Sequence, residues 1–174
     1  NAGAGNNSEL RGTGMPNGVV DAPPGTYYTD TAGTNGAWRW IKTSGTGNTG
    51  WTVIFGDTGW RYIANPANIA GRANFYVRED WRWNLRRVGN LCSLMVFAKS
   101  LSRTTSGTAH LFTIPPEFTP ASVLVTGAGG FLFQIGYSVS LIATPDAGVV
   151  VQDEIKWWAR EPWPTTLPGT PIPV

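Results

Sequence analysis

The chain has 174 residues, of which 22 are Gly, 13 are Pro and 9 are Trp, and only 14% are charged. This composition excludes a coiled coil or helical bundle, which would need more Ala, Glu, Lys and Leu, and a hydrophobic content of 41% excludes a disordered tail. The net charge of +2 creates no broad field for nucleic acid, and no apolar run approaches the length of a membrane span. We therefore expect a globular protein that neither binds nucleic acid nor inserts into a membrane.

The first third of the chain is predicted to contain a linker and a small β-meander. Residues 1–19, rich in Gly and Asn and without hydrophobic periodicity, are typical of a flexible linker. Within residues 20–63, three short runs rich in aromatic and β-branched residues predict strands, and Asn35-Gly36 predicts a two-residue hairpin turn. Those predicted strands are Tyr27–Thr31, Ala37–Lys42 and Trp51–Phe55. Because one such meander has little core of its own, we expect it to pack on another domain or another copy of the chain.

Residues 64–174 are predicted to form an antiparallel, jelly-roll-like β-sandwich that ends in a Pro-rich tail. The stretch 64–78 fits either an irregular strand or a short helical turn. The run Leu91–Leu101 is apolar on both faces and predicts a central strand covered on both sides. Further strands are predicted at 110–114, 121–126, 131–143 and 149–158, separated by turns that contain Gly or Pro. The fold class is therefore all-β, with a tail that cannot join a central strand.

Residues that could carry catalysis or bind a metal are sparse. His110 is the single histidine, and Cys92 is the single cysteine and lies in an apolar run, as a buried small hydrophobe does. The chain has no phosphate-binding glycine motif and no Gly-x-Ser-x-Gly nucleophile motif. The neighbouring acids Asp153 and Glu154 point to opposite faces of a strand, so they do not converge. We therefore predict no catalytic residue, no metal and no cofactor.

Tryptophan gives the strongest functional indication. A flat indole can cover the apolar face of a pyranose, while Arg, Asp and Asn at its rim bind the hydroxyls. Alternation places Trp81 and Trp83 on one strand face and Arg82 and Asn84 on the other. The candidate carbohydrate-binding residues are Trp81, Trp83, Arg82, Asn84, Trp157, Trp158, Asp153 and Arg160.

The alternative is that the indoles fill a core or an interface between chains. We expect this second role, in a core or a trimer interface, for Trp38, Trp40, Trp51 and Phe55. Trp163 stands between two prolines and is predicted to anchor the C-terminal tail.

Two blocks of the sequence carry turn-and-strand motifs. The first has the pattern G-x-x-Y-x-D-T, then N-G-x-W-x-W-x-K, over residues 25–42. The second comprises residues 85–90, 114–120, 144–148 and 161–169. The first block resembles a hairpin of tail-fibre shafts, and the second is similar to the terminal head of siphophage minor tail or receptor-binding proteins, of the type found in phages of Gram-positive actinobacteria.

This resemblance implies a homotrimeric adhesion protein at the phage tail tip, outside the host cell, in contact with the rest of the tail tip. Residues 20–63 would form its shaft, and residues 64–174 would form a head that binds a host surface polysaccharide without catalysis. Three rivals remain open. They are a carbohydrate-binding module of a secreted enzyme, a tail-associated glycan hydrolase, and a purely structural tail protein.

Overall fold

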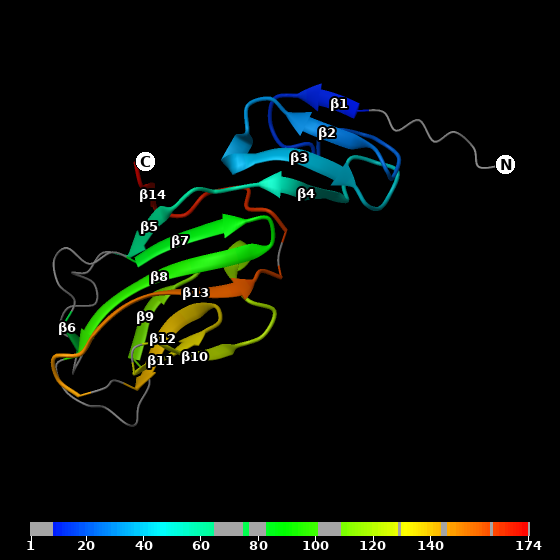
Figure 1. Cartoon of the computed structure of the whole chain (residues 1–174). Coiled ribbons are helices and arrows are strands. Elements are labelled where there is room, and N and C mark those ends of the chain that lie inside the picture. Colours follow the sequence, from blue (N-terminus) through cyan, green and yellow to red (C-terminus); the bar gives the residue numbers. More distant parts are fainter. Residues whose placement is uncertain are drawn as a thin grey trace. The chain divides into compact units, whose positions relative to one another are not determined.

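The computed structural model of the chain describes residues 9–64, 75–76, 83–100, 109–128, 130–143, 146–160 and 162–173 (Figure 1). It is all-β, with 54% strand and 5% helix in three sheets, which confirms the predicted fold class at this level. The chain divides into two compact units. Unit 1 comprises Asn1–Thr58 and Pro162–Leu167, and unit 2 comprises Gly59–Glu161 and Pro168–Val174.

The sheet of unit 1 has four strands in chain order. They are β1 (Glu9–Gly12), β2 (Tyr27–Asp30), β3 (Ala37–Lys42) and β4 (Trp51–Gly56). Strands β2, β3 and β4 pair antiparallel, whereas β1 pairs with β2 in parallel. The predicted linker over residues 1–19 is therefore corrected, because Glu9–Gly12 forms a full ladder of backbone pairs with β2.

The connection between β2 and β3 is wider than the predicted two-residue turn. Asn35 and Gly36 do have positive φ, 53° and 78°, as that motif requires. However, the buried carboxylate of Asp30 accepts hydrogen bonds from the backbone N–H groups of Gly14, Ala32 and Thr34, at 2.9, 2.9 and 2.8 Å. These bonds organise a six-residue loop that includes a short 3₁₀ turn at Thr34–Gly36.

The core of unit 1 is built mainly from aromatic side chains. Tyr28 and Trp51 meet edge to face at 5.9 Å between ring centroids. The buried members of this core are Ala22, Tyr28, Ala37, Trp40, Trp51 and Trp163. The predicted packing of Trp40 and Trp51 is thus observed within one chain. Trp38 is 48% exposed and Phe55 is 64% exposed, so neither belongs to this core.

A segment of the C-terminal tail completes unit 1. Trp163 is buried, and its Nε1 donates a hydrogen bond to the Asn35 carbonyl at 3.1 Å. Its indole lies so close to Gly56 that a Cβ at that position would come within 2.8 Å of the ring. The predicted anchoring by Trp163 is therefore observed. The predicted boundaries differ, because unit 1 ends at Thr58 rather than residue 63 and takes residues from the tail.

Unit 2 contains the other two sheets of the described residues. One has the order β10-β11-β12-β9, and the other has the order β13-β8-β7-β5-β14 with β6 also paired to β8. The first sheet consists of β9 (Ala109–Thr113), β10 (Leu124–Ala128), β11 (Phe131–Ile135) and β12 (Ser138–Ala143). The second consists of β5 (Arg61–Ala64), β6 (Phe75–Tyr76), β7 (Trp83–Val88), β8 (Leu91–Ser100), β13 (Val150–Trp158) and β14 (Thr170–Pro171).

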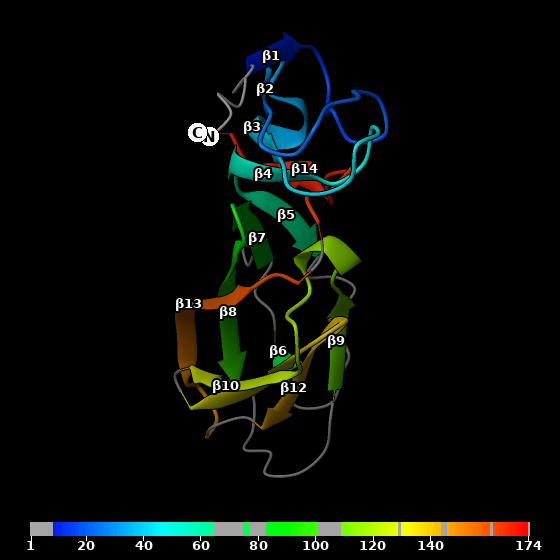
Figure 2. The same cartoon turned by 90° about the vertical axis from the view of Figure 1, so that its right-hand side faces the viewer.

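The two sheets of unit 2 share a single hydrophobic core, which makes the unit sandwich-like (Figure 2). Trp83 of β7 is fully buried and meets Phe112 of β9 and Phe133 of β11 edge to face, at 5.4 and 6.1 Å. Strand β8 lies between β13 and β7, as predicted for a central strand. The tail strand β14 pairs only at the sheet edge, which is where the proline that it contains, Pro171, is tolerated.

Two strand predictions in unit 2 need correction. The run 131–143 is not one strand but two, because the chain turns at Gly136–Tyr137 and β12 pairs back onto β11. The strand predicted at 121–126 begins only at Leu124, since Pro120 forms an isolated bridge with Ala159 instead. The stretch 64–78 lies largely outside the described residues.

Replacing Trp163 with Ala should open the core of unit 1. We expect a loss of about 3–5 kcal/mol, typical of a buried aromatic truncation. Hydrogen exchange followed by mass spectrometry should show faster exchange in β3 and β4 and unchanged exchange in β8. Trp158→Ala, which removes a 70% exposed indole, is the matched control and should leave all three strands protected. Unchanged exchange of unit 1 in Trp163→Ala would contradict the anchoring role.

The buried carboxylate of Asp30 should make unit 1 sensitive to acid. Burial by itself would raise the pKa of Asp30, but the hydrogen bonds from Thr34, Ala32 and Gly14 outweigh it and lower the pKa. The carboxylate therefore stabilises the fold above its unfolded pKa of about 4, and this contribution disappears as the pH falls through the lower folded pKa. We expect Asp30→Asn to be less stable at pH 7 and to lack this acid dependence, as measured by urea unfolding from pH 7 to pH 2. An identical pH profile in the variant would refute this role.

Candidate functional site

Two of the predicted sugar-binding tryptophans are buried. Trp83 is 0% exposed and Trp157 is 5% exposed, because strand alternation turns both toward the shared core of unit 2. The Nε1 of Trp157 donates a hydrogen bond to the Phe118 carbonyl at 2.7 Å. An indole with neither face free cannot stack on a sugar, so this part of the prediction is corrected. Trp81 and Arg82 lie outside the described residues.

Of the three candidate tryptophans that the structure describes, Trp158 is the one at the surface. It ends β13, and its side chain is 70% exposed. The expectation that Trp157 and Trp158 occupy opposite faces of one strand is confirmed. Since Trp157 is fixed inward by its packing and hydrogen bond, Trp158 must project outward from the same strand.

An open hollow of about 350 Å³ lies beside Trp158. It is lined by Pro120, Ala121, Ser122, Val123, Leu124, Lys156, Trp157 and Trp158. Two backbone contacts join its walls, a bridge between Pro120 and Ala159 and a hydrogen bond of 3.2 Å from Arg160 N–H to the Thr119 carbonyl. The hollow therefore has one wall from the end of β13 and another from the segment that leads into β10.

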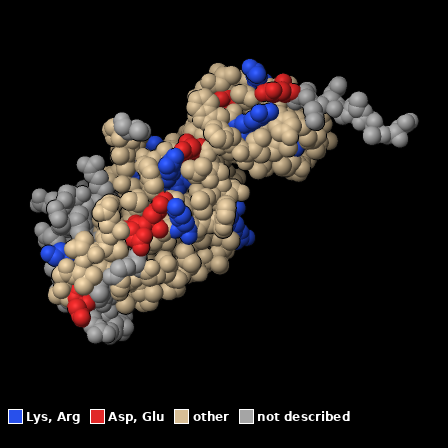
Figure 3. All heavy atoms as spheres, viewed as in Figure 1, with Lys and Arg blue, Asp and Glu red and all other residues tan. Residues whose placement is uncertain are grey.

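Charged side chains accompany Trp158 on the outer face of this sheet. Glu154 and Lys156 precede it at alternate positions, and Glu154 Oε2 lies 3.0 Å from Lys156 Nζ. Backbone register places Lys156 opposite Ser93 of β8, and Ser93 opposite Arg86 of β7. Figure 3 shows acidic and basic atoms side by side over these strands.

The neighbouring polar and charged side chains lower the pKa of Glu154. Burial alone would raise the pKa of Glu154, but hydrogen bonds from Lys156 and Ser93 and the charges of Lys156 and Arg86 outweigh it and lower the pKa. The Glu154 carboxylate is therefore held ionised. A carboxylate in this state does not act as a general acid near neutral pH.

The remaining predicted residues lie in different places. Arg160 is exposed and follows Trp158 by two positions, next to the hollow wall. Asp153 is exposed, and its Oδ1 accepts a hydrogen bond from the Glu154 N–H, but it does not line the hollow. Asn84 lies opposite Met95 and Tyr62 within the sheet and does not line the hollow either.

The sequence analysis missed Lys156 and the wall at 120–124. Lys156 could have been found from the two-residue alternation that it shares with Trp158. The wall could not, because more than 30 positions in the sequence separate it from Lys156, Trp157 and Trp158, and no short motif marks it.

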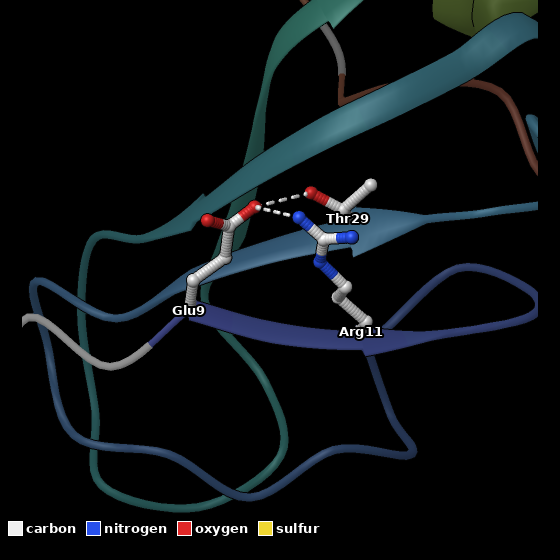
Figure 4. Close-up of polar contacts among 3 residues, drawn as sticks. All are labelled: Glu9, Arg11 and Thr29. Carbon is white, nitrogen blue, oxygen red and sulfur yellow. Dashed lines mark hydrogen bonds and ion pairs between the residues drawn. The ribbon is translucent and has the colours of Figure 1, made fainter.

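A second exposed polar group lies on unit 1. Figure 4 shows Glu9 and Arg11 of β1 together with Thr29 of β2. Thr29 Oγ1 donates to Glu9 Oε1 at 2.9 Å, and Arg11 Nη2 lies 3.8 Å from the same oxygen. These are solvated side chains without a hollow between them, so we assign them a surface role rather than a binding site.

The single histidine and the single cysteine of the chain lie on different strands of unit 2. His110 is exposed at the start of β9, and Cys92 is fully buried in β8. Among the described residues, no three His, Cys, Asp or Glu side chains are close enough to hold a metal ion. No helix within the described ranges is long and apolar enough to cross a membrane.

Comparisons with models of known protein families, with curated proteins and with solved structures found no match to this chain.

The thiol of Cys92 should be unreactive in the folded protein. Burial raises the pKa of Cys92 to about 12, and the nearby Arg87 charge only partly opposes this. We expect almost no alkylation by iodoacetamide at pH 8 under native conditions, and one labelled thiol per chain in guanidinium chloride. Mass spectrometry gives the extent of labelling. Rapid labelling of the native protein would contradict the buried placement.

Proposed function

We propose that this chain is a non-catalytic carbohydrate-binding part of a phage tail adhesion protein. It would recognise a host cell-surface polysaccharide through the hollow beside Trp158. The observation that carries the proposal is the exposed indole of Trp158 at the edge of an open hollow, with polar groups on the same sheet face. The viral assignment rests on the resemblance of the sequence motifs to siphophage tail proteins.

The chemistry of the hollow suits a sugar ring. The indole of Trp158 offers a flat apolar face that can cover the C–H groups of a pyranose. Ser122 is one of the lining residues, and its hydroxyl could bind ring hydroxyls of the sugar. An open site of this kind favours weak binding to a polymer over complete enclosure of a small molecule.

Weak sites become effective when several are held together. In the proposed assembly, three chains form a homotrimer at the tail tip, with unit 1 as the shaft and the jelly-roll-like β-sandwich of unit 2 as the head. Linked sites raise the overall avidity without any new contact, because the second and third binding events become intramolecular. The uncharged side chains of Trp38 and Phe55, exposed on unit 1, are candidates for contacts between copies.

An array of bacterial surface polysaccharides tests the proposed site directly. We expect the intact chain to bind at least one polymer, and Trp158→Ala to weaken that binding by about tenfold or more, since 1.4 kcal/mol corresponds to tenfold. Tyr137→Ala removes another exposed aromatic ring, 75% exposed in the turn before β12, and should bind as the wild type does. Equal binding by Trp158→Ala and wild type would exclude this site.

Light scattering on a gel-filtration peak tests the proposed assembly. A trimer should have a mass of three times 18.7 kDa, about 56 kDa. A stable monomer that still binds a polysaccharide would favour a single-site binding module, and a trimer that binds no polysaccharide would favour a purely structural role.

A further inference from the structure

We propose that the saccharide bound beside Trp158 carries an anionic group, which Lys156 and Arg160 recognise. This inference rests on the proposed carbohydrate-binding function and adds the chemical class of the ligand.

The first observation is the charge of the hollow itself. Of its eight lining residues, Lys156 is the one with an ionisable side chain, and no acid belongs to the lining. The Lys156 side chain is 53% exposed. The ionisable residue among those that line the hollow is therefore a cation, two positions from Trp158 on β13.

The second observation is the position of Arg160. Its N–H donates to the Thr119 carbonyl, and the preceding residue bridges Pro120, which is part of the hollow wall. Lys156 and Arg160 are each two residues from Trp158, about 7 Å along an extended chain. The indole is thus flanked by a cation on either side in the sequence. A guanidinium group binds carboxylate or phosphate oxygens in a bidentate manner.

The third observation is how Lys156 is held. Glu154 Oε2 lies 3.0 Å from Lys156 Nζ, and Glu154 is also close to Ser93 and Arg86. Glu154 therefore positions the ammonium group and neutralises part of its charge. An incoming anion competes with Glu154 for Lys156, so removing the Glu154 charge should tighten the binding of an anionic ligand. Tighter binding after this change would show that Glu154 positions Lys156, whereas weaker binding would show that Glu154 itself contacts the sugar.

Carboxylate, phosphate and sulfate share the chemistry that Lys156 and Arg160 would recognise. The test uses an array with uronic-acid polymers, phosphodiester polymers (teichoic acids), sulfated polymers and neutral polysaccharides. Each uronic-acid polymer is also printed in carboxyl-reduced form, and each sulfated polymer in desulfated form. The three acidic groups on the array identify the source of the anion.

We expect the wild type to bind an acidic polymer about tenfold or more tightly than its neutralised form or the neutral polysaccharides, and to bind less as salt increases. Lys156→Gln and Arg160→Gln should each lose most of this preference while keeping any binding to neutral polymers. Glu154→Gln should strengthen binding to the acidic polymer. Lys99→Gln, which removes a cation from the far end of β8, is the matched control and should behave as the wild type.

The possible failures are distinguishable. Equal binding of acidic and neutral polymers by the wild type would overturn this inference and leave the carbohydrate site in place. Weaker binding of both polymer types by Lys156→Gln would also overturn it, because Lys156 would then contact the sugar without selecting an anion. Absence of binding to every polymer would overturn the proposed function, and this inference with it.

Discussion

Two sheets that are each apolar on one face are stable in water only when those faces cover each other. In unit 2 this requirement places Trp83, Phe112 and Phe133 in one core and fixes which side of every strand faces inward. The outward direction of Trp158 follows from the inward direction of Trp157, since neighbouring residues of a strand point to opposite sides. The placement of Trp158 at the surface is therefore a consequence of core packing.

The site also lies on a strand at the edge of its sheet. Edge strands can pair with other chains unless charged side chains interrupt them. Strand β13 carries Asp153, Glu154 and Lys156, and the edge strand β1 of unit 1 carries the ion pair of Glu9 and Arg11. Strand β4, the other edge of that sheet, has no charged residue from Trp51 to Gly56. The charges on β13 therefore disfavour strand pairing beside the candidate site.

Local patterns in the sequence predicted most of the strands but only part of the site. The alternation of inward and outward side chains in β7 and β13 could be recognised in the sequence, because a two-residue period involves only neighbouring residues. The prediction that Trp83 contacts a sugar was wrong, because the apolar face of β7 packs in the core of unit 2. Strand β1 has only four residues and ends in Gly, so its pairing with β2 left no local signal. The hollow depends on a contact between β13 and a distant segment, which no local pattern encodes.

The burial of Trp163 also determines when unit 1 can form. The chain builds four strands of this unit first, then all the main strands of unit 2, and only afterwards supplies the indole that fills the first core. A ribosome releases the N-terminal residues first, yet the unit they begin remains incomplete until residues 162–167 have emerged. The buried core residues of unit 2 run from Trp83 to Trp157, so that core can form earlier, and only the edge strand β14 follows later. A nascent chain stalled before residue 162 should consequently expose the aromatic cluster around Trp40, so chaperones would meet it there.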